Sequence, residues 1–291
     1  MAEANRSEFQ AFDQPSVASD GTLSAEALAR FERDGFLDLG RIASEGEVLA
    51  LKGNFDRVFS ELTENGSRDF FNFGGTAKDP KAYQMPQLEH LSQYMPLLPT
   101  LDCAKRAHGI ARSLLGPTVK PLFEFGLNKA PQSRLATPWH QDIAFVYDRS
   151  YFEMITIWMP LQHVDMANGC LRYMPGTHKG PVVPHHSVEG NRRGLAADDF
   201  PTDGAIDCPL RAGEAVVHHF RTLHAAEGNA TDEPRRAIAW GFGVRRAKPT
   251  VDGFFPWTRE AHDKQEKLRS ILRHPMLLDP VNRLKLLLGI K

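Results

Sequence analysis

Apolar residues in the first part of the chain recur at the spacing of an α-helix. Between positions 44 and 66 one helical face is formed by Val48, Leu51, Phe55, Val58 and Leu62. Ser44 and Glu47 form a capping box at the start of this helix, and Asn65–Gly66 is suited to end it. Similar stripes predict shorter helices from about Ser24 to Asp34 and from about Leu101 to Leu115. The segment 23–116 is therefore predicted to be largely helical.

The pattern changes at about Val119 to short strand-like runs. These runs are rich in aromatic and β-branched residues and are separated by Gly, Pro and Asn: TVKPLFEFGLNK, YFEMITIWMPLQHV, GCLRYMPG, EAVVHHF and RRAIAWGFGV. Regularly spaced short strands predict a sandwich or barrel over 117–247, and not a parallel sheet with crossover helices. Leu268, Ile271 and Leu272 then share a helical face, which predicts a C-terminal helical segment at 258–291.

Two segments have no clean period. The polar residues 1–22 are expected to form a loosely ordered tail, which leaves 23–291 as a single domain. Residues 68–96 are rich in glycine, proline and aromatic residues. They form either a packed surface loop or a lid over a pocket, because long irregular loops within compact domains are often functional.

Composition narrows the function classes. The 291 residues are 42 % hydrophobic and 24 % charged, as in ordinary soluble proteins, and a net charge of −1 provides no field for nucleic acid or an anionic membrane. The sequence contains neither a signal-peptide pattern nor a long apolar run, so a cytoplasmic protein is expected. Three widely spaced cysteines argue against a disulfide framework and against a thiolate zinc site. The oligomeric state is not indicated.

Candidate chemistry begins with two His-x-Asp triplets, His140–Asp142 and His163–Asp165. Residues i and i+2 of a strand point to the same side, so one imidazole and one carboxylate could face a common point. Two histidines and one carboxylate on one face are the ligand set of non-haem Fe(II) oxygenases. Several later histidines could complete the set. Among them His224 follows a strand-like run and precedes a Gly–Asn turn, and Arg235, eleven residues later, opens another strand.

The order and spacing of four motifs resemble one known family. WHQD, WMPLQHVDMANGCLRYMPGTHKG, GEAVVHHFRTLH and NATDEPRRA are similar to the phytanoyl-CoA dioxygenase-like family of Fe(II)/2-oxoglutarate-dependent oxygenases. The resemblance covers roughly residues 120–245 and, more weakly, FERDGFLDLG near the N-terminus. It implies a mainly β fold with flanking α-helices, built on a double-stranded β-helix of the jelly-roll or cupin-like kind.

The resemblance also implies residue roles. His140, Asp142 and His224 would bind Fe(II), and Arg235 would bind the far carboxylate of 2-oxoglutarate. With O₂, such an enzyme would hydroxylate an unactivated carbon of a small organic metabolite and release succinate and CO₂. Related halogenases replace the aspartate with a small residue, so Asp142 favours hydroxylation. Desaturation, epoxidation and ring formation stay open, and no catalytic residue beyond the metal ligands is implied.

Three further positions follow from the same family pattern. Lys129 matches a basic position near the cosubstrate or substrate, although it could also be a surface lysine. Trp158 matches a tryptophan that lines the site, or else it is an ordinary core residue. Members of the family often carry a serine at the position of Ala226, so another hydroxyl is needed beside Arg235, and Thr156 is our candidate. The triplet at His163 lies in a turn-rich connection and is not expected to bind metal.

The strand RRAIAWG permits a register prediction. Arg235, Ala237 and Ala239 are expected to face the barrel interior, whereas Arg236 is expected to face outward and reach solvent. Aromatic residues that could line a substrate pocket are Phe71, Phe73, Phe123, Phe145 and Tyr147. Two other functions compete with the oxygenase: a cupin-like metalloenzyme that does not use 2-oxoglutarate, and a non-catalytic jelly-roll binding module.

Overall fold

The structure is a computed structural model that describes residues 17–73, 78–145, 152–188, 194–248 and 255–258. The expected C-terminal helical segment beyond Thr258 lies outside the described residues, as do residues 1–16 of the expected tail. No helix among the described residues combines the length and the apolar character needed to cross a membrane.

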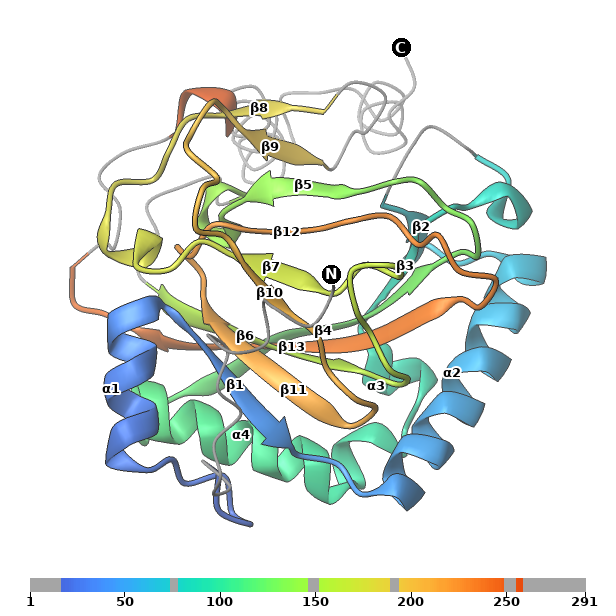
Figure 1. Cartoon of the computed structure of the whole chain (residues 1–291). Coiled ribbons are helices and arrows are strands. Elements are labelled where there is room, and N and C mark those ends of the chain that lie inside the picture. Colours follow the sequence, from blue (N-terminus) through green and yellow to red (C-terminus); the bar gives the residue numbers. More distant parts are fainter. Residues whose placement is uncertain (1–16, 74–77, 146–151, 189–193, 249–254, 259–291) are drawn as a thin grey trace, which may run out of the picture.

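Two antiparallel sheets form the centre of the molecule (Figure 1). The larger sheet has the order β1-β11-β6-β13-β4-β3-β2, and its strands are β1 (Phe36–Arg41), β11 (Glu214–His219), β6 (Phe152–Pro160), β13 (Arg235–Arg245), β4 (Lys120–Lys129), β3 (Pro86–Glu89) and β2 (Phe70–Asn72). The smaller sheet has the order β10-β7-β12-β5, and its strands are β10 (Ile206–Cys208), β7 (Leu171–Tyr173), β12 (His224–Ala226) and β5 (Thr137–His140). A separate pair consists of β8 (His185–Ser187) and β9 (Leu195–Ala197).

The helices cover one face of the larger sheet, and the smaller sheet faces its other side (Figure 1). The α-helices are α1 (Ala25–Asp34), α2 (Glu45–Asn65), α3 (Leu91–Tyr94) and α4 (Asp102–Leu115). Short 3₁₀ helices are η1 (Pro80–Ala82), η2 (Leu98–Thr100), η3 (Asp142–Phe145), η4 (Thr177–Lys179) and η5 (Pro256–Thr258). The mainly β fold with flanking helices is confirmed, and the paired antiparallel sheets are those of a jelly-roll core.

Alternation along the central strands separates two buried clusters. On β13, Ile238 and Trp240 pack with the helices, whereas Ala237 and Ala239 pack between the two sheets with residues of β7 and β12. On β6, Ile157 belongs to the helix-side cluster and Trp158 to the inter-sheet cluster. Successive strand residues point to opposite faces, and both faces of this sheet are covered, so the strands read as nearly continuous apolar runs.

The helix boundaries follow the sequence signals. The Ser44–Glu47 capping box is present at the start of α2, and Ser24 caps α1 through a bond from the Ala27 backbone N–H to its hydroxyl. Gly35 ends α1 with φ of 81°, a left-handed conformation that glycine adopts without strain. These three features confirm the predicted starts of α1 and α2 and the end of α1.

The N-terminal part also contains strands. Phe36–Arg41 forms β1, which pairs with β11 at the edge of the larger sheet. Within 68–96, β2 pairs with β3, and β3 pairs with β4. Much of the expected surface loop or lid is thus an extension of the sheet. Residues 74–77 of this segment lie outside the described residues.

Candidate metal centre and anion pocket

His140, Asp142 and His224 come together at the end of the smaller sheet. His140 is the last residue of β5, Asp142 begins η3, and His224 begins β12 directly opposite His140 in the strand register. One potential ligand atom from each of the three residues lies within 4.8 Å of the others. The Nε2 atoms of both histidines are 3.7 Å from Oδ1 of Asp142. Strand pairing therefore builds a two-histidine, one-carboxylate group, which fits a divalent first-row metal ion.

Backbone contacts fix how the two histidines face this group. Nδ1 of His140 donates to the Pro138 carbonyl at 2.8 Å, and Nδ1 of His224 donates to the Thr222 carbonyl at 3.0 Å. A carbonyl can only accept, so Nδ1 carries the proton and Nε2 presents a free lone pair. Burial lowers the pKa of both imidazoles, that of His224 strongly. Neutral imidazole is the form that binds metal.

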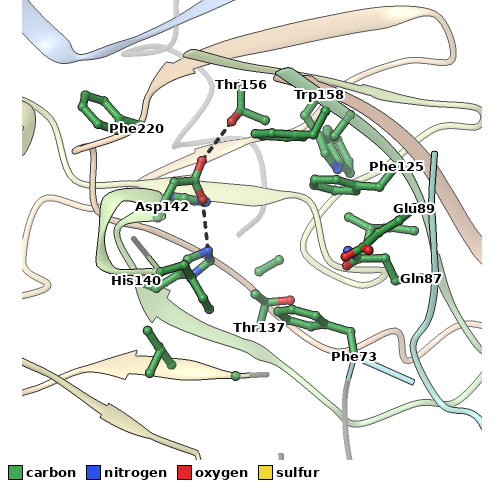
Figure 2. Close-up of a pocket in the computed structure, with 18 of the residues that line it drawn as sticks. Phe73, Gln87, Glu89, Phe125, Thr137, His140, Asp142, Thr156, Trp158 and Phe220 are labelled. Atoms are coloured by element: carbon green, nitrogen blue, oxygen red, sulfur yellow. Dashed lines mark hydrogen bonds and ion pairs between the residues drawn. The ribbon is translucent and has the colours of Figure 1, made fainter. Parts of the chain in front are cut away.

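Asp142 is held as a carboxylate. Burial alone would raise its pKa, but electrostatic interactions with the His224 and His218 rings and the hydrogen bond from His218 outweigh burial and hold the pKa well below its ordinary value. Thr156 Oγ1 also donates to Asp142 Oδ2 at 2.9 Å (Figure 2). An ionised carboxylate next to two neutral imidazoles supplies the hard and borderline donors that Fe(II) accepts.

Gln141, between the two ligand candidates, secures their backbone. Its side-chain Nε2 donates to the Arg221 carbonyl at 2.6 Å, and its Oε1 accepts from the Val183 N–H at 2.9 Å. Its own N–H donates to His185 Nε2 at 3.1 Å. These bonds tie the end of β5 to the chain before β12 and to the chain before β8, so His140 and Asp142 are held on a fixed backbone.

Arg235 is a buried cation that forms no ion pair with a carboxylate of the described residues. Its side chain lines the same cavity as the His–Asp–His group and is 3 % exposed, with its guanidinium carbon 5.4 Å from the centre of the Trp158 ring. Its Nε and Nη1 atoms have no hydrogen-bond partner among the residues that the structure describes. Burial lowers its pKa to about 10. An unpaired buried guanidinium is costly, so the chemistry of this end of the cavity suits an anion.

The register predicted for β13 is confirmed, but the exposure predicted for Arg236 is wrong. Ala237 and Ala239 face the inter-sheet space on the same side as Arg235. Arg236 faces the helices, where it is only 8 % exposed, forms an ion pair with Asp56 of α2 and donates to the Pro234 carbonyl. A helix, and not solvent, covers the outer face of this strand.

Lys129 and Thr156 make contacts that their predicted roles did not include. Lys129 is fully buried, and its Nζ donates to the backbone carbonyls of Ala226 and Glu227. A surface position is therefore wrong, and the burial, with the nearby charge of Arg235, lowers its pKa to about 6. The Thr156 hydroxyl lines the cavity but donates to Asp142. Contacts of either residue with a cosubstrate stay predictions.

The cavity has a volume of about 860 Å³. It is lined by four of the predicted aromatic residues, Phe71, Phe73, Phe123 and Phe145, together with Thr156 and Trp158. The fifth, Tyr147, lies outside the described residues. Lining residues that sequence reasoning missed include Phe125, Phe220, Trp257, Gln87 and Glu89. Alternation from Phe123 could have identified Phe125, whereas Trp257 comes from a segment with no periodic signal.

The second triplet remains on the surface. His163 and Asp165 are 3.5 Å apart, with side chains 61 % and 47 % exposed, and neither belongs to the metal-ligand group. By contrast His218, which sequence reasoning did not select, is buried beside Asp142, with its Nε2 3.2 Å from Oδ2. The sequence signal that could have identified His218 was its position two residues after Val216 of β11, because residues i and i+2 of a strand face the same side and Val216 faces inward.

The chain is similar to known proteins in both sequence and fold. The chain is 26 % identical over 249 residues to the peroxisomal phytanoyl-CoA dioxygenase of Rattus norvegicus. This alignment covers 79 % of this chain and 71 % of the relative. The crystal structure of EvdO2 from Micromonospora carbonacea var. aurantiaca is 34 % identical with a TM-score of 0.71, covering 81 % of this chain and 97 % of EvdO2. EvdO2 complexed with 2-oxoglutarate aligns over the same shares at 35 % identity with a TM-score of 0.69.

A third structural neighbour shares the fold at lower identity. SnoK, a non-heme alpha ketoglutarate dependent carbocyclase from nogalamycin biosynthesis, is 24 % identical with a TM-score of 0.62, covering 82 % of this chain and 95 % of SnoK. The family model for phytanoyl-CoA dioxygenase (PhyH) matches residues 31–237, which is more than half of the chain. The protein therefore belongs to the phytanoyl-CoA dioxygenase family of non-haem Fe(II)/2-oxoglutarate-dependent oxygenases.

Proposed function

We propose that this oxygenase hydroxylates an unactivated carbon of a small organic metabolite, with His140, Asp142 and His224 as Fe(II) ligands and Arg235 as the anchor of 2-oxoglutarate. The observation that supports this most strongly is the unpaired, buried guanidinium of Arg235 in the same cavity as the His–Asp–His group. A single ligand with a metal-binding end and a distant carboxylate would engage both.

The three donors fit Fe(II). Two neutral Nε2 atoms and one carboxylate oxygen face a common point, and the remaining sides of that point open to the cavity. When bound, Fe(II) and 2-oxoglutarate supply the O₂-dependent oxidation of a C–H bond, with 2-oxoglutarate leaving as succinate and CO₂. The chain's own residues supply the binding sites, the orientation and the exclusion of water.

The cosubstrate end is shaped by small side chains around one cation. Ala226 and Ala239 line the cavity beside Arg235, and the Trp158 ring lies over the guanidinium. Arginine binds a carboxylate through two parallel N–H donors. In Arg235 the buried Nε and Nη1 atoms have no hydrogen-bond partner among the described residues, so the guanidinium keeps donors for an anion. Because Ala226 has no hydroxyl, Arg235 carries this recognition without the serine that family members often have.

The substrate end is aromatic with two polar side chains. Figure 2 shows Gln87 and Glu89 beside Phe73 and Phe125, across the cavity from Asp142. Such a wall favours a molecule with an apolar face and hydrogen-bonding groups. An apolar lining of this kind suits oxidation of an unactivated carbon.

Substrate-stimulated succinate release tests the proposal. We expect the purified protein, reconstituted with Fe(II), to form succinate from 2-oxoglutarate in air, and faster with a substrate. Mass spectrometry of the product separates the reaction classes: hydroxylation or epoxidation adds one oxygen atom, whereas desaturation or ring closure removes two hydrogen atoms. A cupin-like enzyme independent of 2-oxoglutarate would bind metal without forming succinate, and a binding module would show neither property.

The segment 68–96 is expected to become more resistant to protease when ligands bind. Phe71, Phe73 and Met85 line the cavity, so a bound ligand would contact this segment and restrict its opening. Limited proteolysis with Fe(II), 2-oxoglutarate and substrate, compared with the ligand-free protein, measures this protection. Equal cleavage within 68–96 under both conditions would show that the segment is a fixed wall and not a lid.

A further inference from the structure

The two oxygens of Asp142 have different surroundings. Oδ1 faces the Nε2 atoms of His140 and His224, at 3.7 Å from each. Oδ2 points away from them and receives two hydrogen bonds, from Thr156 Oγ1 at 2.9 Å and from His218 Nε2 at 3.2 Å. A carboxylate oxygen has two lone-pair directions, so these two donors occupy Oδ2.

The Tyr173 hydroxyl fixes the orientation of the His218 ring. Its Nδ1 accepts a hydrogen bond from the Tyr173 hydroxyl at 3.0 Å, which leaves Nε2 as the N–H that donates to Asp142. Tyr173 is fully buried, and its ring stacks on Phe36 with centroids 4.5 Å apart. Both partners lie in the packed inter-sheet layer, because Tyr173 ends β7 and His218 follows Val216 on the inner face of β11.

From this geometry we infer that His218 is a positioning residue, which Tyr173 orients and which holds Asp142 so that it binds the metal through Oδ1 alone. The inference rests on the metal site proposed above. His218 is not itself one of the ligands, because the mutually close group of potential ligand atoms comprises only His140, Asp142 and His224 among the described residues.

One-oxygen binding matters for the number of free positions. An octahedral metal ion with two histidines and one carboxylate oxygen keeps three positions open. A carboxylate that rotates to bind through both oxygens occupies one of them. By holding Oδ2 away from the metal, the Tyr173–His218 pair would leave room there for both 2-oxoglutarate and O₂.

The test compares four variants. Three of them keep, remove or disorient the N–H group that position 218 donates to Asp142, and the fourth is a control that leaves this group unchanged. His218→Gln keeps an N–H donor at the reach of Nε2, His218→Phe removes it, and Tyr173→Phe removes only the hydroxyl that orients it. His219→Gln is the matched control, because His219 is the neighbour on the opposite face of β11 and lies near Glu153. Anaerobic titration gives the Kd for Fe(II), and the visible charge-transfer band of the Fe(II)–2-oxoglutarate complex reports chelation.

We expect His218→Phe to weaken Fe(II) binding about 10- to 100-fold and to weaken or shift the charge-transfer band, the usual size of effect for a group that orients a ligand. Tyr173→Phe should weaken binding less, while His218→Gln and His219→Gln should stay within about threefold of wild type. Unchanged binding and an unchanged band in both His218→Phe and Tyr173→Phe would overturn the inference. So would a His218→Gln variant as defective as His140→Ala, which would make His218 a ligand.

Two further comparisons keep the result decisive. If His218→Phe does not fold, as judged by its thermal transition, then Tyr173→Phe and His218→Gln decide by the same criteria. Wild-type protein that binds neither Fe(II) nor 2-oxoglutarate would contradict the proposed function. Wild-type protein that binds both, with variants that do the same, would contradict only the role of His218.

Discussion

Replacing His140 or His224 with alanine is expected to abolish 2-oxoglutarate turnover and to weaken Fe(II) binding by about a hundredfold or more. Loss of a partner that merely orients a ligand costs about 10- to 100-fold in metal affinity, and loss of a direct ligand costs at least as much. Both imidazoles are buried, and a backbone carbonyl fixes the Nδ1 atom of each ring. Each ring is therefore held in one orientation, and alanine leaves its ligand position empty. Anaerobic titration with Fe(II) and an assay for succinate measure the two effects.

His163→Ala is the matched control for this experiment. His163 pairs with an aspartate two residues later, as His140 does, but on an exposed surface. We expect this variant to retain both metal binding and turnover. A loss of Fe(II) binding in His163→Ala, or full binding in His140→Ala, would show that the wrong triplet has been assigned to the metal.

Arg235→Ala is expected to raise the KM for 2-oxoglutarate by about a hundredfold or more. Removing one partner of a buried charge pair costs roughly 3–5 kcal/mol, which corresponds to more than two orders of magnitude in affinity. Arg235→Lys should recover only part of this loss, because an ammonium cannot form the two parallel hydrogen bonds of a guanidinium. Initial rates of succinate formation over a range of 2-oxoglutarate concentrations measure KM.

Arg236→Ala separates cosubstrate binding from stability. Arg236 directly follows Arg235 in the sequence, but its side chain faces α2, where its partner Asp56 is 45 % exposed. We expect an unchanged KM and a melting temperature lower by a few degrees, because a partly exposed ion pair contributes about 1 kcal/mol or less. Equal KM values in the two alanine variants would mean that Arg235 does not bind the cosubstrate carboxylate.

Local signals predicted what depends on neighbouring residues in the chain. The Ser44–Glu47 capping box starts α2, and the alternation along β13 places Ala237 and Ala239 toward the inter-sheet space. Both follow from backbone geometry over a few residues. The sequence also predicted that His140 and Asp142 would meet, but spacing alone left several histidines open as the third member. The family resemblance selected His224.

Features that depend on distant partners were missed. β1 lies among helical signals, and what makes it a strand is its pairing with β11 about 180 residues later, where Phe36 lies opposite His218. The exposure of Arg236 was wrong because a helix covers the strand face that was assumed to meet solvent. His218 was passed over because its neighbour His219 has the same chemistry, and only the register of β11 decides which of the two faces the metal centre.

Arg235, a buried cation without a carboxylate partner among the described residues, would link cosubstrate concentration to the folding equilibrium by the binding proposed above. Desolvation of its guanidinium lowers the stability of the ligand-free protein, and a bound dicarboxylate reverses this cost only in the native state. A ligand that binds only the folded chain at a hundred times its Kd adds about 2.7 kcal/mol to the free energy of unfolding. With 2-oxoglutarate anchored by Arg235 as proposed, the native population of this enzyme would rise and fall with the supply of 2-oxoglutarate, so that one contact would govern both turnover and the amount of folded chain.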